Sequence, residues 1–135
     1  MHSDKGEIYN SDKLISQEGD NFTYFSRNGE TDEKSLDIKF DNFSGSDSIW
    51  TIDFKEQIQL KFNYSSEVSK GSFKGVLVSP EKKVNIIFEN SDEGEQTFSG
   101  PAGKYIFKLV GDNTNGKVNV ELTANQDIVI TNIRR

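Results

Sequence analysis

The chain has 135 residues and a mass of 15.2 kDa, which is the size of one domain with one core. Its net charge of −6 repels phosphate backbones and anionic headgroups, so we expect no nucleic-acid partner. The sequence has no Cys and one His, His2, which excludes disulfides and thiolate sites and leaves Ser–His–Asp chemistry and His-based metal sites without support.

The first 20 residues are polar, interrupted only by Ile8, Tyr9, Leu14 and Ile15. We expect them to form a flexible lead or a first edge strand, followed by a domain over 21–135. No stretch approaches the ~20 apolar residues of a membrane span, and 1–21 lack the apolar core of a signal peptide. The chain is then either cytosolic or an exported chain whose signal or lipid anchor lies upstream of this sequence.

From residue 21 onward, apolar side chains recur at every second position, which is typical of strands. The pattern predicts strands at 35–40, 49–54, 58–64, 84–88 and 118–122. The segment 104–110 is apolar on both faces apart from Lys108, which predicts a central strand. Trp50 shares the phase of Ile52 and Phe54, so we expect it in the core.

Gly, Asn, Ser and Pro clusters between these segments predict turns. They lie at 27–30, 43–47, 69–72, 79–83, 90–95, 100–103 and 113–116. About eight to ten short strands with such spacing indicate a sandwich or a barrel. The predicted fold class is therefore all-β: a two-sheet antiparallel β-sandwich, jelly-roll-like.

The Gly- and Asn-rich connector at 111–116 invites comparison with a calcium loop. With Gly116 at the sixth position of an EF-hand loop, the twelfth is Leu122 instead of Glu, and Glu121 falls one residue short. We therefore interpret it as a hairpin connector in which Asn115 and Gly116 take positive φ.

Acidic side chains in the predicted loops are the other candidates for chemistry. They are Asp32, Glu33, Asp41, Asp47, Asp92, Glu93 and Glu95. Loops at one end of a sandwich can converge carboxylates on calcium, and two facing acids could cleave glycosides. Neither arrangement has a spacing signature, so we assign no catalytic, metal or binding residue; the roles of Tyr9, Tyr24 and Tyr64 stay open.

The order of segments carries a family resemblance. Asp47 precedes a strand containing Trp50, Val78-Ser79-Pro80 ends a strand, and Gly103-Lys104-Tyr105 begins another that is followed by Gly116. In these features residues 43–124 resemble the pre-peptidase C-terminal type of domain. They are also similar to uncharacterised secreted proteins and lipoproteins of Gram-positive bacteria.

The resemblance implies a small jelly-roll-like sandwich without catalytic activity. Our first hypothesis is an extracytoplasmic binding or structural module of a Gram-positive cell surface, whose partner is a cell-surface or extracellular macromolecule. The alternative is a calcium-binding accessory domain that assists folding or substrate attachment of a secreted enzyme. A carboxylate-based hydrolase ranks third. The residues imply no cofactor other than this calcium.

Overall fold

The computed structural model describes residues 8–17, 20–32, 34–124 and 129–132, and strands dominate them. In chain order the elements are α2 (Asp12–Ser16), β1 (Asn21–Thr23), β2 (Ser26–Thr31), β3 (Ser35–Phe54), β4 (Ile58–Val78), β5 (Val84–Glu89), β6 (Asp92–Gly100), β7 (Gly103–Ala124) and β8 (Val129–Asn132). All the strand pairings between these elements are antiparallel. No helix among the described residues is long and apolar enough to cross a bilayer.

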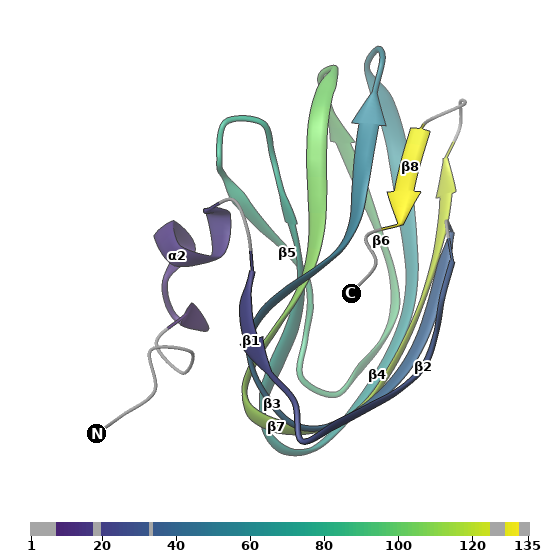
Figure 1. The fold of residues 1–135 in the computed structure, drawn as a ribbon. Coiled ribbons are helices and arrows are strands. Elements are labelled where there is room, and N and C mark those ends of the chain that lie inside the picture. The colour runs from purple at the N-terminus through teal and green to yellow at the C-terminus, as the bar shows by residue number, and fades with distance from the viewer. Residues whose placement is uncertain (1–7, 18–19, 33, 125–128, 133–135) are drawn as a thin grey trace.

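Three long strands, β3, β7 and β4, lie side by side and bend near their middles, so that the sheet folds over onto itself (Figure 1). One set of halves forms a first layer with the order β2-β3-β7-β4-β6. The other halves form a second layer, in which β5 pairs with β4 while β1 and β8 pair with β3. This arrangement confirms the antiparallel sandwich, although its layers are two halves of one sheet.

The bends fall where the sequence predicted turns. At 43–47, 69–72 and 113–116 the chain continues as strand, so the prediction of chain reversals there is wrong. The same residue types supply the bend, because Asn42, Gly45, Gly71 and Asn113 have φ between 49° and 110°. Left-handed residues bend a strand at a bulge without ending its pairing with the neighbouring strands.

The other four predicted turns can also be placed. Residues 79–83 connect β4 to β5 and 100–103 join β6 to β7, as expected. Residues 27–30 lie within β2, and of 90–95 only 90–91 form a connection, because β6 begins at Asp92. The segment 104–110 lies in β7, between β3 and β4, which confirms its central position.

The core lies between the two layers and is rich in aromatic side chains. Phe62 of the first layer contacts Phe107 of the second with ring centroids 5.5 Å apart, and Tyr64 stacks on Phe88 at 5.0 Å. Trp50 is fully buried, as its phase predicted, and its Nε1 donates a hydrogen bond to the Asp32 carbonyl oxygen at 2.6 Å. Alternation therefore identified the core face in β3, β4 and the second half of β7, but it was wrong in β5, where a bulge in the pairing with β4 leaves Ile86 exposed and buries Ile87 beside Phe88.

The N-terminal segment covers the outer face of the second layer. Residues 12–16 form helix α2, which Ser11 caps by accepting a hydrogen bond from the Leu14 amide. Ile15 is fully buried, in a cluster that also contains Ile8, Val76 and Val110. The expectation of a flexible lead or an edge strand is therefore wrong for residues 12–16. The division of the chain into domains at residue 20 stays a prediction.

Two buried lysines hold this segment to the sheet. The Lys108 ammonium donates hydrogen bonds to the carbonyl oxygens of Ile15 at 2.8 Å and Gln17 at 2.9 Å. The Lys74 ammonium donates to the Tyr9 carbonyl oxygen at 2.8 Å and lies 4.4 Å from the centre of the Tyr9 ring. The bonds from Lys108 satisfy carbonyl groups at the C-terminal end of α2, where a helix leaves its carbonyl oxygens without an internal partner. A five-residue helix is too short to show a periodic pattern, which explains why the sequence did not reveal it.

Candidate binding groove

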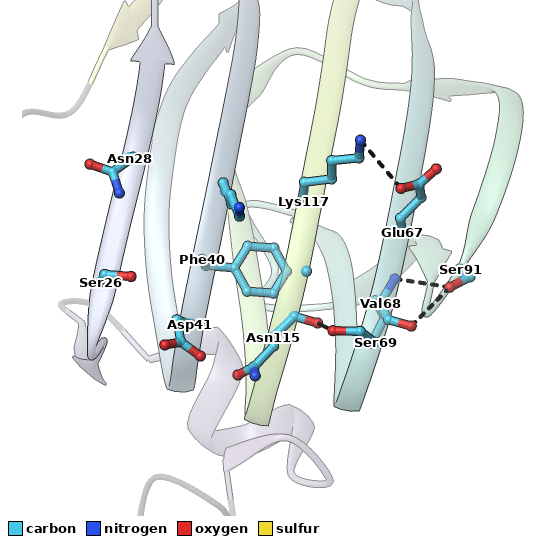
Figure 2. A pocket seen from close by; sticks show the side chains of 12 residues that line it. Ser26, Asn28, Phe40, Asp41, Glu67, Val68, Ser69, Ser91, Asn115 and Lys117 are labelled. Atoms are coloured by element: carbon cyan, nitrogen blue, oxygen red, sulfur yellow. Dashed lines mark hydrogen bonds and ion pairs between the residues drawn. The ribbon is translucent and has the colours of Figure 1, made fainter.

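A groove of about 790 Å³ lies on the outer face of the first layer, next to the bends (Figure 2). This volume is within the range of small-molecule and cofactor sites. The lining is mostly polar: Ser26, Asn28, Lys39, Phe40, Asp41, Glu67, Val68, Ser69, Ser91, Asn115, Gly116 and Lys117.

Strand register brings the central groove residues together. Asn28 of β2 pairs with Lys39 of β3, Lys39 pairs with Lys117 of β7, and Lys117 pairs with Glu67 of β4. Side chains at directly paired positions point to the same face of a sheet. The four side chains therefore form one polar row across four strands, which we call the groove row.

The charged groups of the groove balance one another. The Lys117 ammonium lies 3.4 Å from the Glu67 carboxylate, and both side chains are more than 60% exposed. An ion pair exposed to this degree contributes at most about 1 kcal/mol, so a ligand can replace it at little cost. Lys39 and Asp41 add one charge of each sign, and the groove as a whole is neutral.

Residues of the bends form hydrogen bonds with one another at the end of the groove that is drawn lowest in Figure 2. Asn115 accepts a hydrogen bond from the Asn42 amide through its Oδ1 at 2.8 Å, and its carbonyl oxygen accepts from the Ser69 hydroxyl at 3.3 Å. Positive φ occurs at Asn113 and not at Asn115 or Gly116, so that prediction is wrong. The connector at 111–116 is a bend inside β7, and two of its residues line the groove.

The acidic residues singled out in the sequence lie in separate places. Asp41 lines the groove, Asp47 is buried, and Glu95 lies on edge strand β6, 3.8 Å from the Lys61 ammonium. Among the described residues, no three acidic or His side chains are grouped closely enough to hold a metal ion. Glu33 lies outside the described residues, and the calcium hypothesis stays a prediction.

Two further acidic residues serve local structure. Asp32 accepts hydrogen bonds from the amides of Lys34 and Ser35, both at 2.9 Å, which lowers the pKa of its carboxyl group. Asp92 accepts a hydrogen bond from the Glu93 amide at 2.9 Å and one from the Tyr64 hydroxyl at 3.3 Å.

Asp47 anchors the segment between β1 and β2. Its Oδ2 accepts a hydrogen bond from the Tyr24 hydroxyl at 2.7 Å and lies 3.7 Å from the Arg27 Nε. The Tyr24 ring stacks on Phe43 with centroids 4.4 Å apart. Burial, and then the negative charge of Asp47, raise the pKa of the Tyr24 hydroxyl. The buried carboxylate therefore fixes Tyr24 in one position.

All four tyrosines have a raised pKa, with burial as the largest cause of each shift. Below pH 10 the raised pKa values do not reduce the free energy of unfolding, because the tyrosines are protonated in both the folded and the unfolded chain. As the pH rises further, the unfolded chain loses these protons first, and the free energy of unfolding falls. We expect guanidinium unfolding midpoints to drop steeply above about pH 10.5, with Tyr absorbance at 295 nm rising together with unfolding.

At lower pH the two buried lysines change the free energy of unfolding in the opposite direction. Burial lowers the pKa of Lys74 and Lys108, so between the lowered pKa and about 10.4 the unfolded chain binds more protons and stability rises with pH. The steep loss of stability therefore begins only after the lysines have titrated in both the folded and the unfolded chain. Tyrosines that ionise near pH 10 in a folded chain of unchanged stability would contradict this expectation.

Among the residues of the groove lining, Asp41, Asn115 and Gly116 are recognisable as candidates in the sequence, whereas the groove row is not. Lys39 and Lys117 look like ordinary solvated residues in the sequence, and Asn28 lies in the segment 27–30 that the sequence predicted as a turn. Only the register of four strands shows that they are neighbours.

Comparisons with known proteins show no family membership. No family model matches the chain, and no curated protein matches it. A similar solved structure is the C-terminal CBM6 of LamC, a marine laminarinase from Zobellia galactanivorans. It is 16% identical, with 82% of this chain and 99% of that chain covered and a TM-score of 0.38. A similarity of this size is too weak to bear on function, and the resemblance to the pre-peptidase C-terminal type stays a prediction.

Proposed function

We propose that the chain is a non-catalytic binding module whose groove takes a polar, uncharged chain of an extracellular macromolecule. The observation that carries this proposal is the groove row, in which Asn28, Lys39, Lys117 and Glu67 project from four adjacent strands into one open groove. Amide, hydroxyl and charged groups in one site can both donate and accept hydrogen bonds, as recognition of a hydroxyl- or amide-rich chain requires.

The position of the groove fits an extended ligand. It runs over the face of β2, β3, β7 and β4 and is not closed into a cavity (Figure 2). The cell surface of a Gram-positive bacterium presents such chains, in agreement with the extracytoplasmic location that we propose. Balanced charge in the groove favours a ligand without strong net charge of its own.

The groove contains two carboxylates, Asp41 and Glu67, and these are the residues on which a hydrolase would depend. Asp41 and Glu67 come from β3 and β4, which are separated by β7, so their backbones are roughly 10 Å apart across the sheet. Glu67 is paired with Lys117. Turnover of a bound chain that is lost in both Asp41→Asn and Glu67→Gln would overturn this proposal in favour of a hydrolase.

The proposal is tested by binding to immobilised peptidoglycan, neutral polysaccharides and collagen peptides, followed by titration calorimetry of any binder. Lys39→Ala is expected to weaken binding about three- to tenfold, since it removes one charge-assisted hydrogen-bond donor from the groove. Lys61→Ala is the matched control, because Lys61 lies on the same layer about six residues further along the strands, roughly 20 Å away. Equal affinities of the two variants would contradict the placement of the site.

The same titrations in EDTA and in millimolar calcium distinguish this proposal from the alternative of a calcium-binding accessory domain. Binding through the groove row is expected to be unchanged in EDTA. Binding that requires calcium, together with a rise in the melting temperature when calcium is added, would favour the accessory-domain hypothesis instead.

A further inference from the structure

Phe25 is the most exposed large apolar side chain among the described residues, with 78% of its surface open to solvent. Ile86 of β5 is the other large exposed one, at 53%. An exposed aromatic ring leaves a large apolar area in contact with water, and burying that area would be favourable. Aromatic residues are enriched where proteins bind their partners. A single exposed side chain is common in proteins, so the surroundings of Phe25 decide what it means.

The backbone of Phe25 is fixed at the end of the groove. Its amide donates a hydrogen bond to the carbonyl oxygen of Asp41 at 2.8 Å, and Asp41 and the next residue, Ser26, both line the groove. Ser26 and Asp41 are also directly paired across β2 and β3. The backbone of Phe25 therefore adjoins the groove lining in the chain and across the sheet, and its exposed ring lies just outside the residues that form this lining.

Tyr24, the residue before Phe25, cannot turn its ring outward in place of Phe25. Tyr24 is held inside by its hydrogen bond to the buried Asp47 and by stacking on Phe43. The Arg27 guanidinium lies 5.9 Å from the centre of the Tyr24 ring and 3.7 Å from Asp47. With Tyr24 anchored on one side and Ser26 paired on the other, the backbone that presents Phe25 is rigid, and little entropy is lost when a ligand contacts it.

We propose that Phe25 is an aromatic stacking residue for a sugar ring at the end of the groove, so that the ligand is a neutral glycan. This inference rests on the proposed function and names the ligand class of the same site. A sugar ring combines an apolar face of C–H groups, which suits Phe25, with hydroxyl groups, which suit the amides and charged groups of the groove. The balanced charge of Lys39, Lys117, Asp41 and Glu67 favours a neutral glycan over an anionic one.

The test uses the full chain and neutral hexasaccharides of glucose, mannose and N-acetylglucosamine as probes, measured by titration calorimetry. Phe25→Ala is expected to weaken binding about tenfold, and Phe25→Trp is expected to keep or strengthen it, because the larger ring offers more stacking area. Ile86→Ala is the matched control and is expected to bind as the unchanged chain does, since it removes an exposed apolar side chain from the other layer. Melting temperatures of all three variants are expected to stay close to that of the unchanged chain.

The outcomes distinguish this inference from the proposed function. If Lys39→Ala weakens glycan binding while Phe25→Ala does not, the groove binds glycans and the assignment of Phe25 is wrong. If the chain binds none of the hexasaccharides but binds a Pro-rich or collagen peptide, and Phe25→Ala and Lys39→Ala both weaken that binding, the groove is confirmed and the glycan is overturned. If Lys39→Ala weakens none of the binding that is observed, the proposed function fails as well.

Discussion

Replacing Gly71 with alanine is expected to destabilise the chain by roughly 3–5 kcal/mol and to lower its melting temperature by roughly 10–20 °C. Gly71 has φ of +75° at the bend of β4, a conformation that alanine adopts only with strain. An added Cβ would also collide with the Asn113 carbonyl oxygen and would come within 2.6 Å of the Asp112 carbonyl oxygen. Both oxygens belong to the bend of β7, which lies between β3 and β4 and cannot move aside.

Gly94→Ala is the control for this substitution. Gly94 lies on edge strand β6, and a Cβ there would meet the Tyr64 hydroxyl oxygen at 3.4 Å, an ordinary contact. Alanine also restricts the unfolded chain, so stability is expected to stay the same or to rise slightly. Thermal unfolding followed by circular dichroism compares the two variants. A Gly71→Ala chain that melts within 2 °C of the unchanged protein, on the scale of ~3–5 °C per kcal/mol, would show that the bend does not require glycine.

Replacing Lys108 with alanine is expected to cost roughly 2–4 kcal/mol of stability. The side chain is 1% exposed, and its ammonium donates to two carbonyl oxygens, those of Ile15 and Gln17. Alanine leaves these carbonyl groups without their donor and opens a cavity between α2 and the sheet. Residues 8–17 are then expected to exchange their amide hydrogens faster than β3 and β7 do, because the segment detaches before the sandwich unfolds.

Two further variants show which part of the Lys108 side chain accounts for the loss of stability in Lys108→Ala. Lys108→Met refills the space without a donor and is expected to recover part of the lost stability, which separates packing from hydrogen bonding. Lys61→Ala removes an exposed lysine whose ion pair with Glu95 spans 3.8 Å, and it is expected to change stability by less than about 1 kcal/mol. Unchanged amide exchange at 8–17 in Lys108→Ala would show that this lysine does not hold the segment.

The contact between α2 and the sheet has a bearing on the groove. The N-terminal segment covers the second layer, whereas the outer face of the first layer carries the groove. The two outer faces of the sandwich therefore differ in kind, since one is apolar and covered and the other is polar and open. A destabilising change at Lys108 is accordingly expected to leave ligand affinity at the groove intact while the chain is folded.

The amino-acid sequence by itself determined the fold class and the core. Period-two alternation is a local property, and Leu36, Ile38 and Phe40 or Ile52 and Phe54 show it without reference to the rest of the chain. The same phase placed Trp50 inside, and the structure confirms it. The apolar character of both faces of 104–110 was sufficient to place that segment in the middle of the sheet.

Tertiary structure alone decided the bends, the N-terminal helix and the groove. Gly and Asn at positive φ can reverse a chain or bend a strand, and pairing with β7 on one side decides between these outcomes at Gly71. Helix α2 depends on Lys108, a residue far away in the sequence. The groove row depends on register across four strands, because outward polar residues become a site only when cross-strand pairing places them side by side.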